Sequence, residues 1–139
     1  TVQRFIPNEL SDESQRDPGS AFKAFQNFSE LIKRFPESEY IEDAEQRMRH
    51  LRNNLASNEV HIATYYMRRG AFIAAVNRAR YVVENYCRTT VVPEALVIIA
   101  KAYRILEMED LAKDAVRVLK LNYPNHPGIY EVEEELEIK

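Results

Sequence analysis

Three histidines and one cysteine are the side chains of this chain best suited to bind a metal or attack a substrate. His50 and His61 are eleven residues apart in one predicted helix, which separates them by about 16 Å. Because the ligands of a metal ion lie about 2 Å from it, these two residues cannot share one. His126 stands beside Pro127 in a predicted turn. We interpret all three as surface histidines and expect no metal site.

Nucleophilic and phosphate chemistry is no better supported. Cys87 is the only cysteine and has no paired base, so we interpret it as a small turn residue. The three glycines are scattered and form no phosphate loop. Two acidic pairs, Glu42–Asp43 and Glu109–Asp110, fall in the first turns of predicted helices, where the helix dipole favours carboxylates. The sequence therefore predicts no catalytic residue, no cofactor and no enzyme activity.

A group of arginines is suited to binding a protein partner rather than to catalysis. Between residues 59 and 92, five Arg stand against two Glu, a local charge of +3 in a chain of net charge -3. Residues 130–139 hold five Glu and one Lys, a charge of -4. The chain as a whole therefore has no strong attraction for nucleic acid. Arginine suits protein interfaces because its planar guanidinium binds carboxylates at two points. An ordinary solvent-exposed helix surface, which binds no partner, has the same composition.

The elements that carry these residues follow a repeat. Three alanines are each followed eleven residues later by an aromatic residue, and two of the three aromatics precede a proline. Upstream, Ile62-Ala63-x-x-Tyr66 matches Ile99-Ala100-x-x-Tyr103. Small and aromatic residues at these spacings, closed by proline, resemble the tetratricopeptide (TPR) pattern of paired helices. The predicted repeat-packing residues are Ala24, Ala63, Tyr66, Ala75, Ala100, Tyr103 and Ala112.

Helical spacing of the apolar residues predicts an all-α fold, a TPR-like α-solenoid of antiparallel helix pairs. One long helix is expected from about residue 38 to 69, about 45 Å long and shared by two pairs, with Ser38 as its cap and Gly70 at its end. The first repeat lacks its upstream half. We expect residues 1–16 to end a preceding repeat, 17–124 to form the repeats, beginning at an Asp17 cap, and 125–139 to form an acidic capping helix or tail.

The ends of the chain indicate a fragment. No stretch approaches the roughly 18 apolar residues that span a bilayer. The opening Thr-Val-Gln-Arg has none of the features of a signal peptide. The absence of an initiator methionine and the incomplete first repeat together predict that the chain is part of a longer protein.

Several strings go beyond what a TPR scaffold requires. They are Asp17-Pro18-Gly19-Ser20-Ala21-Phe22, Phe35-Pro36-x-Ser38-x-Tyr40, Tyr65-Tyr66-x-x-Arg69-Gly70-Ala71 and Val76-Asn77-Arg78. In this order they resemble the BamD family, outer-membrane lipoproteins of the bacterial β-barrel assembly machinery. Members carry five TPR-like repeats behind a lipidated cysteine, so the resemblance implies that this chain holds about repeats three to five. Cys87 stands where the family pattern has proline.

The resemblance implies a non-catalytic scaffold at the periplasmic face of the outer membrane. Such a scaffold docks to the periplasmic domains of the barrel subunit BamA and organises the other assembly lipoproteins, and it meets the membrane only through a lipid anchor outside this chain. Asn77 and Arg78 are then the first partner-binding candidates. The candidates that extend this surface are Arg68, Arg69 and Arg80.

Two other classes of function stay open at this point. One is another TPR adapter, in the cell envelope or the cytosol, that captures peptides through residues such as Asn77 and Lys101. The other is an accessory domain of an enzyme whose chemistry lies in a different region. A signal peptide ending in a lipidation cysteine would favour the BamD reading over a cytosolic adapter.

Overall fold

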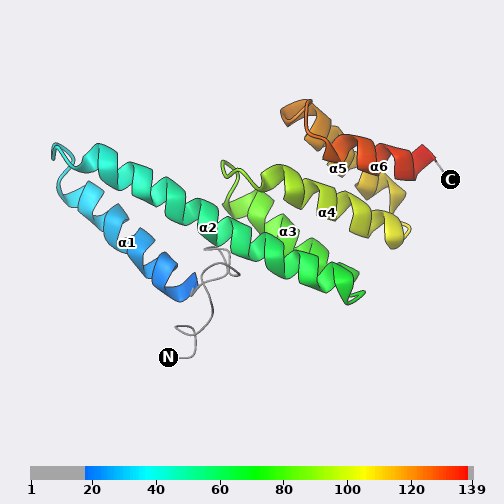
Figure 1. Cartoon of the computed structure of the whole chain (residues 1–139), viewed down its shortest axis with the longest axis horizontal. Coiled ribbons are helices and arrows are strands. Elements are labelled where there is room, and N and C mark those ends of the chain that lie inside the picture. The colour runs from blue at the N-terminus through cyan, green and yellow to red at the C-terminus, as the bar shows by residue number, and fades with distance from the viewer. Residues whose placement is uncertain (1–17, 138–139) are drawn as a thin grey trace, which may run out of the picture. The chain divides into compact units, whose positions relative to one another are not determined.

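The computed structural model describes residues 18–137, and all the regular structure in that range is helical (Figure 1). This confirms the predicted all-α, TPR-like fold. The expected segment 1–16 and the expected Asp17 cap lie outside the described residues. The chain divides into two compact units, residues 1–58 and 59–139, which are described in turn.

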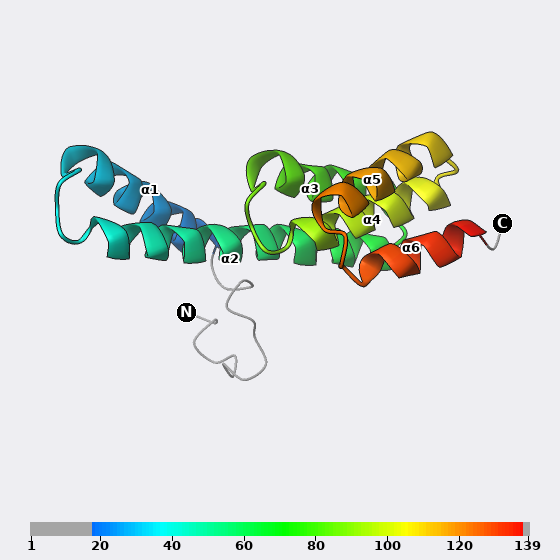
Figure 2. The ribbon, with the colours of Figure 1, turned by 90° about the horizontal axis from the view of Figure 1, so that it is seen from above.

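The first unit contains α1 (Pro18–Arg34) and the beginning of α2 (Ile41–Arg68), which lie side by side in both views (Figures 1 and 2). Between the two helices Ser38 makes the turn: its Oγ accepts from the N–H of Tyr40 at 3.3 Å, and its carbonyl accepts from the N–H of Ile41 at 3.3 Å. These bonds satisfy N–H groups that a helix start leaves without a partner. The long helix therefore begins at Ile41, three residues later than predicted.

α2 has 28 residues, so it is about 42 Å long. Its residues 59–68 belong to the second unit. Gly70 ends it with φ of 76°, a conformation that a side chain disfavours. The N–H of Ala71 bonds back to the carbonyl of Tyr66 at 2.9 Å, and that of Gly70 to Met67 at 3.2 Å. This is the Schellman arrangement of a glycine-terminated helix.

The second unit contains four more helices beside the end of α2. They are α3 (Phe72–Asn85), α4 (Val92–Ile105), α5 (Glu109–Asn122) and α6 (Gly128–Glu137). α4 packs against both α3 and α5 and supplies much of the core. Its fully buried alanines, such as Ala95 and Ala100, have no side chain large enough to keep neighbouring helices apart.

α6 is formed by the acidic end of the chain and packs on α4 and α5. Ile129 and Val132 are buried there, whereas the side chain of Leu136 lies outside the described residues. A Cβ on Gly128 would lie 2.5 Å from Cγ2 of Val97, so the glycine lets α6 approach α4 closely. Among the described helices, none combines the length and the apolar composition needed to cross a bilayer.

Candidate partner-binding site

One side of α3 is buried and the other is open to solvent. Ala75, Ala79 and Val82 are fully or almost fully buried, at the spacing of one helical face. Asn77 lies opposite that face and is exposed, while Arg78 lies at the edge nearest α2. Asn77 thus faces away from the buried alanines, and Arg78 is turned toward α2.

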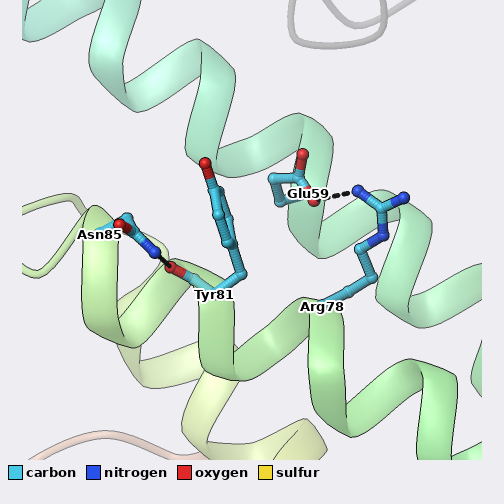
Figure 3. A network of polar contacts seen from close by, with 4 residues as sticks. All are labelled: Glu59, Arg78, Tyr81 and Asn85. Carbon is cyan, nitrogen blue, oxygen red and sulfur yellow. Dashed lines mark hydrogen bonds and ion pairs between the residues drawn. The ribbon is translucent and has the colours of Figure 1, made fainter.

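The Arg78 guanidinium is held by an acidic residue of α2. Its Nη1 donates to Oε2 of Glu59 at 2.9 Å (Figure 3). The Glu59 side chain is 18% exposed and that of Arg78 is 46% exposed, so the acid is the more enclosed partner. The hydrogen bond and charge of Glu59 raise the pKa of Arg78, and the Tyr66 phenol adds a smaller effect in the same direction. Arg78 is thus a fixed, permanently charged group at a partly open surface.

The other three candidate arginines are also exposed. Arg80, on α3, donates to Glu84 at 3.3 Å across one helical turn. Arg69, at the end of α2, lies over the ring of Tyr65 at 5.7 Å from its centre, a cation–π contact. Arg68 is exposed beside it. The arginines therefore occupy two places, the outer side of α3 and the turn between α2 and α3.

The predicted repeat-packing residues lie inside or at the edge of the two units. Ala63, Ala75, Ala100 and Ala112 have no exposed surface. Tyr66, Tyr103 and Ala24 are partly buried. Ala24 belongs to the first unit, where it lines a surface hollow of about 410 Å³ together with residues of α1 and α2, and the others belong to the second.

Sequence reasoning missed Glu59 and Tyr81. Glu59 is nineteen residues from Arg78 in the chain, and only the register between α2 and α3 brings them together. A signal exists in the sequence, because Glu59 precedes Ala63 and Tyr66 by four and seven residues and so shares their helical face. Tyr81 is exposed on α3, and its ring meets that of Tyr86 edge to face at 5.8 Å.

The residues considered for chemistry stay apart from this surface. Cys87 is exposed in the turn after α3. His126 is used structurally, since its Nδ1 accepts from the N–H of Gly128 at 3.0 Å. Within residues 18–137, no group of three His, Cys, Asp or Glu is placed to hold a metal ion.

Lys101, considered above for peptide capture, contacts the acidic helix instead. Its Nζ donates to Oε2 of Glu131 in α6 at 3.0 Å. Lys120 of α5 makes a second ion pair with α6, through Glu133. The acidic end of the chain thus neutralises two lysines of the repeats.

The family model and the individual relatives that match this chain agree with one another. The family model described as outer membrane lipoprotein, YfiO, matches residues 2–119. Outer membrane protein assembly factor BamD of Neisseria gonorrhoeae is 47% identical over 127 residues, 90% of this chain and 47% of that protein. BamD of Vibrio cholerae is 37% identical over 111 residues, covering 80% and 46%. BamD of Xylella fastidiosa is 36% identical over 118 residues, covering 85% and 40%.

The chain spans less than half the length of these curated relatives. The family match nonetheless covers most of this chain and includes the whole of α3, with Asn77 and Arg78. The chain belongs to the YfiO family of outer membrane lipoproteins, the BamD family that the sequence predicted.

Proposed function

We propose that this chain takes part in outer membrane protein assembly as a non-catalytic scaffold. In this role it docks to the periplasmic domains of BamA at the periplasmic face of the outer membrane and helps to hold the other assembly lipoproteins there. The assembly role is supported by the name of its relatives, outer membrane protein assembly factor. A binding role also suits a TPR-like fold, in which paired helices present an extended surface.

The observation that carries the docking surface is the Arg78–Glu59 pair. A guanidinium has five N–H donors, and Glu59 accepts from Nη1 of a side chain that is 46% exposed. Glu59 therefore fixes the orientation of the Arg78 guanidinium, and the exposed part of the guanidinium can still bind a carboxylate of a partner. Orientation before binding reduces the entropy that a long side chain loses in an interface.

Peptide capture by Lys101 is supported less well. The Lys101 ammonium is already paired with Glu131, so an incoming carboxylate would have to replace that acid. Asn77 lies on α3, whereas Lys101 lies on α4. We therefore favour the scaffold function over peptide capture.

The test is calorimetric titration of the 139-residue chain with the purified periplasmic domains of BamA. We expect Arg78→Ala to weaken binding by about 2 kcal/mol, roughly 30-fold in Kd. Arg117→Ala is the matched control, because Arg117 is an exposed arginine on α5 that is also paired within its helix, with Asp114 at 3.3 Å. Equal affinities for the parent and Arg78→Ala would remove Arg78 from the interface, and a parent chain that does not bind would overturn the proposal.

A further inference from the structure

A hollow of about 280 Å³ is built by residues of α2, α4 and the beginning of α6, with no contribution from α3. Its apolar lining comes from Val60 of α2 and from Val97 and Ile98 of α4. Val60 and Val97 are buried, so this part of the lining belongs to the core of the second unit. Three helices therefore fix the shape of the hollow.

The polar lining combines two carboxylates, a hydroxyl and an imidazole. They belong to Glu94, Glu131, Thr64 and His126. The Oγ1 of Thr64 donates to a main-chain carbonyl one turn earlier at 2.9 Å, and its lone pairs can still accept. The Nδ1 of His126 accepts from the N–H of Gly128 at 3.0 Å, so the proton of the neutral ring is on Nε2, which can donate. The hollow thus offers both acceptors and a donor.

The charge around the hollow is negative. Glu94 is an exposed carboxylate in the first turn of α4. Glu131 accepts from Lys101 through Oε2 at 3.0 Å, and its carboxylate has a second oxygen that can bind another donor. α6 holds five Glu and no cation, and Lys101 and Lys120 compensate two of these charges. The hollow therefore favours a cation.

The size of the hollow fits one long side chain. Sites for small molecules usually have volumes of about 300–1,000 Å³, and this hollow lies just below that range. A guanidinium has five N–H donors in one plane, so it can bind carboxylates from two helices at once. The aliphatic stem of an arginine also packs well on apolar side chains such as Val97 and Ile98.

We infer that this hollow binds an arginine side chain from an extended segment of a partner protein. Glu94 and Glu131 bind the guanidinium, and Thr64 and His126 bind the main chain of the same segment. The family match ends at residue 119, so the wall formed by α6 lies beyond it. The site shares no residue with the Arg78–Glu59 pair, and it can exist whether or not that pair binds BamA.

The test is an NMR titration of the 139-residue chain with the peptide acetyl-Ala-Arg-Ala-amide, followed through the backbone amides of Thr64 and Gly128. We expect saturable shifts of both signals. The same peptide with citrulline, which keeps the shape of arginine without its charge, should produce none.

Variants locate the bound cation. Glu94→Gln should raise the Kd about threefold or more, and Glu94→Gln combined with Glu131→Gln about tenfold. Glu109→Gln is the matched control, because Glu109 is an exposed carboxylate in the first turn of α5 and does not line the hollow; its Kd should equal that of the parent. Circular dichroism of each variant verifies the helical fold.

Each other result has a definite meaning. Equal shifts with the arginine and citrulline peptides overturn the binding of a cation. Shifts that Glu94→Gln does not reduce show diffuse attraction to the acidic surface and overturn the site. Spermidine that binds more tightly than the arginine peptide identifies a free polyamine as the occupant and overturns the protein segment. Arg78→Ala should bind the peptide as the parent does, so failure of the BamA titration leaves this inference standing.

Discussion

The ion pair between Glu59 and Arg78 joins α2 to α3, and its two partners differ in exposure. Replacing Arg78 by Gln leaves a carboxylate that is only 18% exposed without its cation, whereas replacing Glu59 by Gln leaves a cation that water can reach. We therefore expect Arg78→Gln to destabilise the chain more than Glu59→Gln. A double-mutant cycle by urea unfolding should give a coupling energy of about 0.5–1 kcal/mol.

The raised pKa of Arg78 sets the pH dependence of this coupling. A cation whose pKa is raised by folding adds stability that is complete below its ordinary pKa and is lost only as the pH rises through the folded value. For an arginine this range lies above about pH 12. Loss of the coupling energy on raising the pH from about 6 to 9 would mean that a group other than Arg78 controls the pair.

Glu107 occupies the position that Gly70 holds in the preceding repeat, four residues after the matching tyrosine. Its φ is 61°, a left-handed conformation, and the N–H of Met108 bonds back to the carbonyl of Tyr103 at 2.8 Å as in the glycine-terminated helix. Side chains other than Gly, Asn and Asp adopt this conformation at a cost.

We accordingly expect Glu107→Gly to stabilise the chain by about 1 kcal/mol, seen as a rise in Tm of about 4 °C by calorimetry. The matching change Gly70→Ala should destabilise by a similar amount, although no atom lies within 4 Å of the added Cβ. A lower Tm for Glu107→Gly would show that the Glu107 carboxylate stabilises the fold by more than the left-handed backbone conformation destabilises it.

The pairing of helices depends on small side chains where they cross. Ala75 is fully buried on α3, and α3 packs against α4. A leucine there would overpack the crossing and cost about 1–3 kcal/mol. We expect Ala75→Leu to lower the Tm, whereas Asn77→Leu, on the exposed face of the same helix, should stay within about 0.5 kcal/mol of the parent. An unchanged Tm for Ala75→Leu would contradict this helix pairing.

Helix identities could be predicted from the sequence because each helix carries its own apolar periodicity. The end of α2 was also predictable from the sequence, because it depends on a single residue, Gly70, whose backbone can adopt the left-handed conformation that ends a helix. The start of α2 at Ile41 was not, because the turn made by Ser38 competes with helix formation over three residues. Local pattern alone could not decide that competition.

The candidate site was predictable only in part. Asn77 and Arg78 were named from their strings, and the exposed side of α3 follows from the buried alanines. The ion pairs of Arg78 with Glu59 and of Lys101 with Glu131 span 19 and 30 residues of chain. They depend on the register between helices, which periodicity within one helix does not specify. Tyr81 was not predicted as an exposed residue, because nothing in the local pattern separates an exposed tyrosine from one that packs against a neighbouring helix.

At the scale of the whole molecule, the two units bury very different amounts of apolar surface. In the described part of the first unit the buried apolar residues are Ala44, Leu55 and Ala56, whereas α4 alone contributes eight buried residues to the second. In a repeat fold each element is stabilised mainly by its nearest neighbours, so stability follows local burial. The helices of the second unit should therefore open less readily than α1.

Hydrogen exchange of the 139-residue chain followed by mass spectrometry measures this directly. We expect amides of α4 to exchange only through global unfolding, and those of α1 through a local opening at least about 2 kcal/mol less costly, a difference of about 30-fold in rate. Urea should accelerate exchange in α4 more strongly, since a larger opening exposes more surface. Equal opening energies for α1 and α4 would mean that the chain unfolds as one cooperative body, and the surface that we propose for docking on α3 would then be no more persistent than the first unit. The expected order places that proposed surface beside the most stable helix, which keeps Arg78 in position when α1 opens.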